Sequence, residues 1–491
     1  MKNPFNGLLT VLLCAAPLLV NGQDDNRPLP SGPQTDGDFR KVILDVSPNH
    51  TDAVKDPMEM AVAKDGRVFY AQRAGTVKMW SPKTQKTIEV GHLTVEDYAK
   101  MGLEDGLLGI TLDPDFLKNG FVYLMYSPPE TKLDAKGKKT GENRVSRFTL
   151  KNETLDLASE KILLSVATQR EQCCHAAGSM AFDAKGNLYI ATGDNTHPGA
   201  SDGYTPIDER PGREPWDAQK SAANANDLRG KILRITPQKN GTIKIPKGNL
   251  FAPGTKGTRP EIYAMGCRNP FRISVDQKTG YVYWGEVGPD SNDFKEGRGP
   301  AGQDEINQAR TAGNFGWPYF VGDNKPYWYF DFASNKTGDK YDAASPVNRS
   351  PSNTGITNLP PAQPAFIWYP YSQSTKFPVV NSGGGRTAMA GPVYYFDPKL
   401  KSEHKLPAEF DHTLFIFEWS RNWIIAVHLD ATDHIAKMER FCPNMTFKRP
   451  MDLELGPDGC LYLIEYGTAW GNNLDSQIVR LEYTGNYSPK P

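Results

Sequence analysis

The chain has 491 residues, is rich in glycine (45) and proline (39), contains 11% aromatic residues and carries a formal net charge of −1. Basic and acidic residues are interspersed, so the sequence offers no basic stripe for nucleic acid and no polybasic segment for a lipid surface. The composition is typical of a turn-rich β protein, and one closed repeat fold can hold a chain of this length.

The first 22 residues have the pattern of a secretory signal peptide. Lys2 gives a positive start, an apolar run follows from Leu8 to Val20, and the segment ends on the small residue Gly22. We therefore expect a signal peptide at 1–22, a linker at 23–40 and a secreted protein. No other stretch is long and apolar enough to cross a membrane, so we expect no membrane span.

Asn-x-Ser/Thr sequons are more frequent than chance requires and predict a secreted glycoprotein. They lie at Asn49, Asn152, Asn240, Asn335, Asn348, Asn444 and Asn486.

A weak repeat runs through the mature chain: a turn with Asp, Asn or Gly, followed by a short β-prone run. Its copies lie at 64–70, 118–123, 185–190, 279–284, 411–417 and 457–462. Each copy is a hairpin signal. Six copies at long, uneven spacing predict an all-β fold, a six-bladed β-propeller with long loops between its strands, over residues 41–483. A sandwich of unrelated hairpins is the alternative.

Two segments stand outside this repeat. Residues 290–406 are rich in Pro, Gly, Asn and Trp, and we expect a large insertion there that folds over one face. Residues 484–491 are expected to form a loose C-terminal tail.

A histidine and an aspartate flank one predicted strand. His175 precedes the strand and Asp194 follows it, so the two can meet at one end of a hairpin. A carboxylate beside an imidazole fixes its tautomer and stabilises its cation, which makes the imidazole a competent base. The alternative is a surface histidine near a turn aspartate.

Five cysteines remain after signal cleavage: Cys173, Cys174, Cys267, Cys442 and Cys460. The adjacent pair can form a vicinal disulfide, or each member can pair elsewhere, for example with Cys267. Cys442 and Cys460 flank one turn and strand and can also pair. The odd number leaves at least one thiol unpaired or in an intermolecular bond.

The stretch 266–318 is polar, glycine-rich and patterned. Arg268 lies in a Gly/Pro-bounded loop and offers a fork of donors to an anionic cofactor or an oxyanion. The Gly288-Pro289 turn and Glu305, beside Asp304, offer the carbonyl and carboxylate oxygens that calcium prefers. A structural arginine and solvated acids are the alternatives. Upstream, Glu104 opens a glycine-rich loop that can face a site.

Together these motifs resemble the soluble quinoprotein glucose/sorbosone dehydrogenase family, which are six-bladed propellers that use pyrroloquinoline quinone (PQQ) and calcium. The resemblance spans roughly 41–482. It is carried by Gly106-Leu107-Leu108-Gly109, Asp113-Pro114-Asp115-Phe116, His175 with Gly193-Asp194, Gly230-Lys231-Ile232-Leu233-Arg234, Arg268-Asn269-Pro270, Gly288-Pro289, Asp304-Glu305-Ile306-Asn307, Gly313-Asn314-Phe315-Gly316-Trp317-Pro318 and Pro457-Asp458-Gly459.

The resemblance implies a role for each site residue. His175 is the base that takes the proton of a sugar's anomeric hydroxyl, Asp194 orients it, and Arg268 stabilises oxygen charge, with Asn269 beside it. The carbonyls of Gly288 and Pro289 bind the calcium that polarises the quinone. Glu305 belongs to a second, structural calcium site. The substrate is an aldose or related sugar, and the electron acceptor is external, a cytochrome or a quinone.

The chain departs from the family pattern where the cofactor binds. Glu104 replaces a glutamine, Cys174 replaces an acidic residue, and Ser420 stands at the lysine position with Arg421 beside it. Arg449 matches one of the two arginines that bind the cofactor's carboxylates, and Met451 stands at the other. The alternative function is therefore a non-catalytic propeller that binds a glycan or a protein, as in the hedgehog-interacting relatives.

Overall fold

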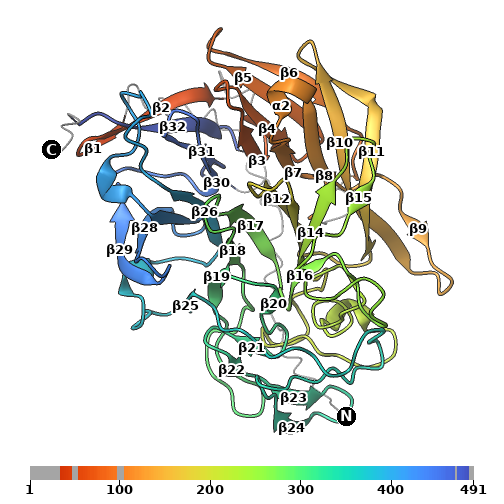
Figure 1. Cartoon of the computed structure of the whole chain (residues 1–491). Coiled ribbons are helices and arrows are strands. Elements are labelled where there is room, and N and C mark those ends of the chain that lie inside the picture. The colour runs from red at the N-terminus through yellow and green to blue at the C-terminus, as the bar shows by residue number, and fades with distance from the viewer. Residues whose placement is uncertain (1–33, 47–53, 97–103, 470–472, 486–491) are drawn as a thin grey trace, which may run out of the picture. The chain divides into compact units, whose positions relative to one another are not determined.

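The computed structural model describes residues 34–46, 54–96, 104–469 and 473–485. The predicted signal peptide at 1–22 lies outside these ranges. Six sheets, each with a core of four antiparallel strands, form the blades of a β-propeller in the described part of the chain (Figure 1). The predicted all-β, six-bladed fold is confirmed, and the sandwich alternative is not.

The strands fall into four sets by their position in a blade. The first, innermost strands are β3 (Pro57–Val62), β7 (Leu107–Leu112), β12 (Ala177–Phe182), β17 (Pro270–Val275), β26 (Ala388–Tyr394) and β30 (Pro450–Leu455). The second strands are β4 (Val68–Gln72), β8 (Phe121–Tyr126), β13 (Leu188–Thr192), β18 (Val282–Glu286), β27 (Thr413–Glu418) and β31 (Leu461–Glu465).

The remaining two positions complete the blades. The third strands are β5 (Thr76–Ser81), β10 (Lys139–Lys151), β14 (Lys231–Pro237), β19 (Asp304–Ala309), β28 (Trp423–Leu429) and β32 (Gln477–Tyr483). The fourth, outer strands are β6 (Lys86–His92), β11 (Thr154–Gln169), β16 (Ile262–Met265), β25 (Ile367–Tyr369), β29 (Ile435–Phe441) and β2 (Phe39–Val46).

All six sequence repeats occupy the same place in the fold. Each copy forms the turn after the first strand and the start of the second strand. In the first copy, Gly66 turns the chain at φ +83° and its N–H donates to the carbonyl of Ala63. Strands β4, β13, β18, β27 and β31 are buried along their whole length. Neighbouring blades cover both faces of these strands, so their sequences are mostly apolar up to a polar last residue.

Buried polar side chains tie the innermost strands into a ring. Glu59 of β3 accepts hydrogen bonds from the backbone N–H of Ile110 (2.8 Å) and of Met180 (3.3 Å), which lie on the next two blades. Arg272 of β17 donates to the carbonyl of Met451, and Asp452 accepts from the N–H of Met60. Arg272 therefore supports the centre of the propeller.

The ring of blades closes between the two ends of the described chain. β2 pairs with β32 in antiparallel register from Phe39↔Tyr483 to Val46↔Gln477, and β1 (Gln34–Asp36) extends this blade (Figure 1). The expected boundary at Lys41 thus falls inside a strand, and residues 34–40 belong to the propeller. β2 is the outer strand of its blade's four-strand core, and its buried positions, Phe39 and Lys41, alternate only at its start.

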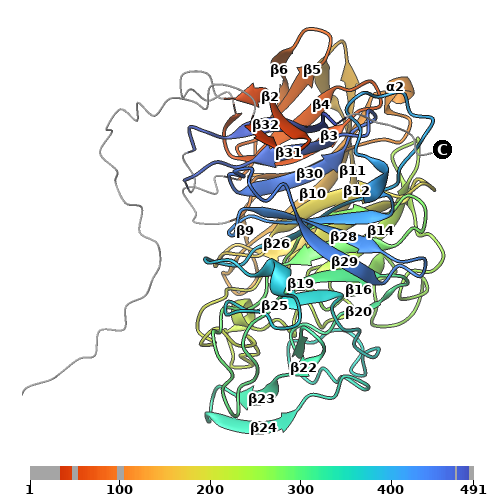
Figure 2. The ribbon, with the colours of Figure 1, turned by 90° about the vertical axis from the view of Figure 1, so that its left-hand side faces the viewer.

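The expected insertion at 290–406 also contains three blade strands, β19, β25 and β26. Their neighbours are loops rich in Pro and Gly, which hide the β pattern. The rest of the segment carries β20 (Gly313–Asn314), the hairpin of β21 (Phe320–Val321) and β22 (Lys325–Pro326), and the hairpin of β23 (Trp328–Asp331) and β24 (Lys336–Lys340). Both views place these hairpins beyond β19 and β25, away from the inner strands (Figures 1 and 2).

Few other elements occur in the described residues. They are the short strands β9 (Lys132–Leu133) and β15 (Ile243–Lys244), the helix α2 (Phe116–Asn119), and the 3-10 turns η3 (Glu214–Trp216), η4 (Pro378–Val380) and η5 (Ala408–Phe410). Within the described ranges, no helix has the length and apolar character needed to span a membrane.

Candidate active site

The loops at the ends of β12 and β13 bring His175 and Asp194 together. His175 precedes β12, Asp194 follows β13, and these strands are antiparallel neighbours. The Nδ1 of His175 lies 2.7 Å from Oδ1 of Asp194, and both side chains are buried. Burial opposes ionisation of Asp194, but the charge and hydrogen bond of His175 outweigh it, so the pKa of Asp194 lies below its ordinary value.

Three further donors hold the Asp194 carboxylate. Oδ1 accepts hydrogen bonds from the backbone N–H (2.9 Å) and the hydroxyl (2.7 Å) of Thr196, and Oδ2 accepts from the indole Nε1 of Trp317 (2.7 Å). Trp317 lies in a motif that carried the family resemblance, but its contact with Asp194 had no local sequence signal. With the carboxylate fixed, Nδ1 of His175 faces it and Nε2 is the nitrogen left for chemistry.

Glycine is required between β13 and Asp194. A Cβ at Gly193 would lie 1.9 Å from the carbonyl oxygen of His175 and 3.1 Å from Oδ1 of Asn269. No other residue allows the two loops to approach so closely. The family motif Gly193-Asp194 therefore has a steric cause as well as a chemical one.

Arg268 and Asn269 lie against the same pair. The backbone N–H of Asp194 donates to the carbonyl of Arg268 (2.8 Å), and Oδ1 of Asn269 accepts from the N–H of Ala177 (3.1 Å). The Arg268 guanidinium donates to the carbonyl of Val287 (2.8 Å) and lies 3.8 Å from a carboxylate oxygen of Asp290. The structure thus places Arg268, Asn269, His175 and Asp194 next to one another.

A narrow pocket opens beside His175. Its lining includes Glu104, Cys173, Cys174, His175 and Asn195. Oε2 of Glu104 accepts a hydrogen bond from the N–H of Ala176 (3.1 Å), which places Glu104 next to the histidine. Cys173 and Cys174 form a disulfide with each other on the pocket wall. The vicinal pairing is therefore the alternative that the structure contains.

The other cysteines are not joined to one another. Cys267, Cys442 and Cys460 are buried and stand outside any disulfide within the described residues. The second pairing that we considered, Cys442 with Cys460, is not formed: both thiols are free and buried in the same core cluster.

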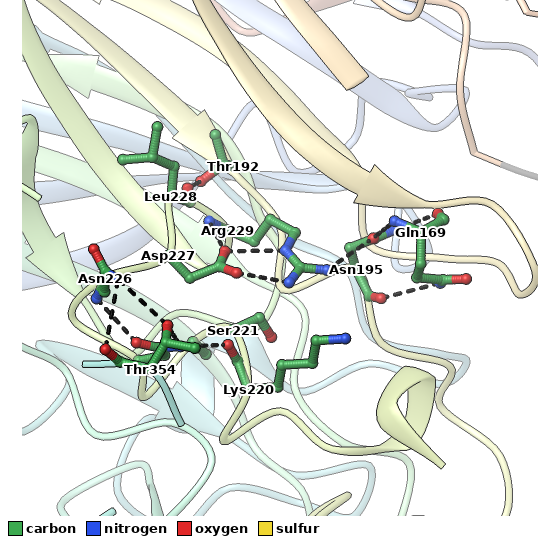
Figure 3. A network of polar contacts seen from close by, with 12 residues as sticks. Gln169, Thr192, Asn195, Lys220, Ser221, Asn226, Asp227, Leu228, Arg229 and Thr354 are labelled. Carbon is green, nitrogen blue, oxygen red and sulfur yellow. Dashed lines mark hydrogen bonds and ion pairs between the residues drawn. The ribbon is translucent and has the colours of Figure 1, made fainter. Parts of the chain in front are cut away.

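Asn195 and Arg229, which also line this pocket, belong to a polar network (Figure 3). Arg229 makes two hydrogen bonds to the Asp227 carboxylate, at 3.0 and 2.6 Å, and a third to Oδ1 of Asn195 at 3.3 Å. Asn195 also accepts from the backbone N–H of Gln169 (2.7 Å). The network fixes the loop that follows Asp194.

The loop expected to hold calcium already faces an arginine. Nη2 of Arg386 donates to the carbonyl of Pro289 (2.6 Å), and Nη1 lies 3.4 Å from Oδ1 of Asp304. Asp304 itself accepts from the backbone N–H of Gly288 (3.0 Å). A calcium ion bound to the Pro289 carbonyl would lie within about 5 Å of a guanidinium, a repulsive arrangement of like charges. The donor set at Gly288 and Pro289 therefore does not fit calcium.

Glu305 does not complete a second metal site either. Oε1 accepts the N–H of Gly322 (2.5 Å), Oε2 accepts the side-chain amide of Asn307 (3.1 Å), and burial raises the pKa of Glu305 to about 7. Among the described residues, no group of three or more His, Cys, Asp or Glu side chains could hold a metal ion. Glu305 instead anchors the loop at Gly322.

The two remaining cofactor candidates lie in different surroundings. The Arg421 guanidinium donates to the carbonyls of Gly385 (2.8 Å), Val380 (3.1 Å) and Pro370 (2.9 Å), so its donors are used within the fold. Arg449 is half-buried, stacks on Trp419 and donates to the carbonyl of Ala469 (2.9 Å). Of the two, Arg449 keeps the more accessible charge.

This combination defines a class: a six-bladed propeller with a carboxylate-held histidine at a loop face lined by arginines. Comparison with known proteins identifies the family within this class. The Glucose / Sorbosone dehydrogenase family matches residues 54–357, more than half of the chain. The chain belongs to this family, as the sequence motifs predicted.

Individual relatives agree with this assignment. The chain is 25% identical to the aldose sugar dehydrogenase YliI of Escherichia coli over 418 residues (84% of this chain, 88% of that protein). It is 24% identical to quinoprotein glucose dehydrogenase B of Acinetobacter calcoaceticus over 390 residues (77% and 76%). The fold is similar to the PQQ-bound aldose sugar dehydrogenase of Streptomyces coelicolor (TM-score 0.54, 17% identity, covering 90% and 98%).

Proposed function

We propose that this protein is a PQQ-dependent dehydrogenase that oxidises an aldose or related sugar at its anomeric carbon. The observation that carries the proposal is the buried His175–Asp194 pair beside a pocket and an arginine-lined loop, in a chain of the glucose/sorbosone dehydrogenase family. When bound, PQQ supplies the acceptor for the hydride that leaves the anomeric carbon. An external acceptor, a cytochrome or a quinone, would take up the electrons.

His175 is the base in this proposal. Nδ1 is held at Asp194, so Nε2 accepts the proton of the anomeric hydroxyl. Loss of that proton makes hydride departure from the same carbon favourable. Asp194 stabilises the imidazolium that forms, and Trp317 and Thr196 keep the carboxylate in place.

The residues at this face fit an oxygen-rich anion such as PQQ. Arg268 and Arg386 lie on either side of the loop from Val287 to Asp290, and Arg449 adds a third cation. The buried hydroxyl of Tyr327 has no hydrogen-bond partner among the described residues and can donate to such a group. Glu104 and Asn269 complete the set that would hold cofactor and sugar. The predicted calcium is not part of this proposal.

We also infer that the protein is secreted. The signal-like segment at 1–22 and the sequons support export, and a disulfide such as Cys173–Cys174 persists in an oxidising compartment.

A reconstitution experiment tests the function. Purified protein is titrated with PQQ by calorimetry, and dye reduction is then followed with a panel of aldoses. We expect PQQ binding and turnover in the wild type, and PQQ binding without turnover in His175→Gln. Absence of PQQ binding would contradict the proposal and favour the alternative of a non-catalytic propeller that binds a glycan or protein.

A further inference from the structure

We propose that Arg386 is the cation that faces the cofactor at the Pro289 carbonyl, in the place where the family resemblance implies calcium. This inference rests on the proposed function, because it names how the same site binds PQQ. It assigns a cofactor-binding role to a residue that no motif had marked, and it predicts that cofactor binding here is independent of calcium.

The contacts of Arg386 place its charge at the Gly288-Pro289 turn. Nη2 donates to the Pro289 carbonyl at 2.6 Å, and Asp304, which is fully buried, lies 3.4 Å from Nη1. Asp304 in turn binds the backbone N–H groups of Gly288 (3.0 Å) and Ala388 (2.9 Å). One carboxylate therefore joins the Gly288-Pro289 turn to the segment that carries Arg386, and the arginine is fixed there.

The guanidinium has a donor that the protein does not use. Arg386 is 5% exposed, and within the described residues its Nε has no hydrogen-bond partner, while Nη1 has only the 3.4 Å ion pair with Asp304. An arginine is always charged, and leaving its buried donors without acceptors is costly. A donor left in this state beside a functional loop points to an acceptor that arrives from outside, and the acceptor that suits a guanidinium is a carboxylate or quinone oxygen.

The side chain that covers Arg386 is partly exposed. The ring of Tyr371 lies against the guanidinium, with 3.8 Å from its Cζ to the ring centroid, and Tyr371 is only half-buried. Its hydroxyl reaches Asp290 at 3.4 Å, a long contact, and the Asp290 side chain is 51% exposed. A ligand that displaces Tyr371 and Asp290 reaches Arg386 from the solvent side, and meets Arg268 on the other side of Asp290.

Charge balance also favours an arginine over a metal. The Pro289 carbonyl has a monovalent cation at hydrogen-bond distance, and Asp304 neutralises that cation. Calcium needs six to eight oxygen ligands, and the nearest carboxylate, Asp304, already binds two N–H groups and faces the guanidinium. A buried, fixed cation can polarise a cofactor oxygen without a metal.

The test measures PQQ affinity by calorimetry in excess EDTA and in saturating CaCl₂. We expect the same dissociation constant in both, within about twofold. PQQ binding that occurs only with calcium would overturn the inference and leave the proposed function intact. No PQQ binding in either buffer would contradict the proposed function, and the inference with it. A calcium titration of the cofactor-free protein should give no heat of binding.

Three variants test whether Arg386 itself contributes to PQQ affinity. Arg386→Gln should weaken PQQ binding by roughly tenfold or more in EDTA, because a charge-assisted contact is lost. Arg310→Gln is the matched control, since Arg310 follows the end of β19 opposite to Asp304 and binds Gln308 and the carbonyl of Asp433. Arg386→Lys keeps the charge beside Asp304 and should give intermediate affinity. Unchanged PQQ affinity in a folded Arg386→Gln protein would overturn the role of Arg386.

Discussion

Trp317 donates its indole N–H to Oδ2 of Asp194 across 2.7 Å, although the two residues are 123 positions apart in the chain. Asp194 reaches this contact from the end of β13, and Trp317 from the loop that follows β20. Together with His175 on Oδ1, the indole holds the carboxylate from both sides. The orientation of the proposed base therefore depends on packing between two distant segments.

Replacing Asp194 should impair catalysis more than binding. Asp194→Asn removes the negative charge that stabilises the imidazolium of His175, so we expect kcat to fall by roughly 10²- to 10⁴-fold with little change in the PQQ dissociation constant. Steady-state dye reduction and PQQ calorimetry measure the two quantities. Asp433→Asn is the matched control, because Asp433 binds His412 at 2.9 Å on a different blade. Equal losses in the two variants would contradict a special role for Asp194.

A methyl group at Gly193 should disrupt the site. In Gly193→Ala the new Cβ would lie 1.9 Å from the His175 carbonyl oxygen, so backbone must move. We expect a loss of about 1–3 kcal/mol in unfolding free energy and loss of turnover. Chemical denaturation measures the first effect. Gly383→Ala, where a Cβ meets no atom within 4 Å, should change neither quantity. A fully stable and active Gly193→Ala protein would contradict the close approach of these two loops.

Stability should fall as pH rises through the neutral range. Burial raises the pKa of several carboxyl groups: to about 8 for Glu59, Glu286 and Glu418, about 7 for Glu305 and about 6 for Asp217. These groups bind protons more tightly in the folded than in the unfolded state. Their contribution to stability is complete below their unfolded pKa values and is lost as pH rises through the folded ones.

We therefore expect the melting temperature to decrease between about pH 5 and about pH 8. Differential scanning calorimetry across this range measures the slope. Asp217→Asn should flatten the acidic part of this slope, because it removes the carboxyl group that titrates there. The fold should be kept, because an amide can still accept from the N–H of Gln219 and donate to Ser350. A melting temperature that rises steadily across the range would contradict the assignment.

If the protein is secreted, glycans should be attached at sequons whose asparagine is exposed. Asn152, Asn240 and Asn335 are exposed, whereas Asn348 is 1% exposed and its amide donates to the carbonyls of Gln219 (2.8 Å) and Ala223 (3.0 Å). We expect glycans on exposed sites and none on Asn348. Peptide mass spectrometry of protein from a eukaryotic secretory host measures this. A glycan on Asn348 would contradict the described packing there.

The sequence predicted the blades because each second strand is a local signal. A turn followed by a strand buried on both faces gives a short apolar run in every copy, from Val68 in β4 to Leu461 in β31. Strands such as β25 and β2 were not predicted, because they are outer strands whose pattern is diluted by exposure or by neighbouring Pro and Gly. Their place is fixed by pairing with distant segments.

The site was predicted where chemistry and spacing coincide, as for His175 and Asp194. Arg386 was missed because it follows three glycines and its partners Pro289 and Asp304 lie 97 and 82 residues earlier in the chain. Arg421 carried the right charge at the right position, but its donors bind loop carbonyls, which sequence cannot reveal.

The central claim is that the PQQ-loaded protein removes hydride from an anomeric carbon. The most direct measurement is the initial rate of dye reduction with an aldose, with the same aldose carrying deuterium at that carbon, and with its alditol, which has no anomeric carbon. The account predicts turnover of the aldose, slower turnover of the deuterated sugar and none of the alditol. Equal rates with aldose and alditol, or no rate with any aldose despite bound PQQ, would contradict it.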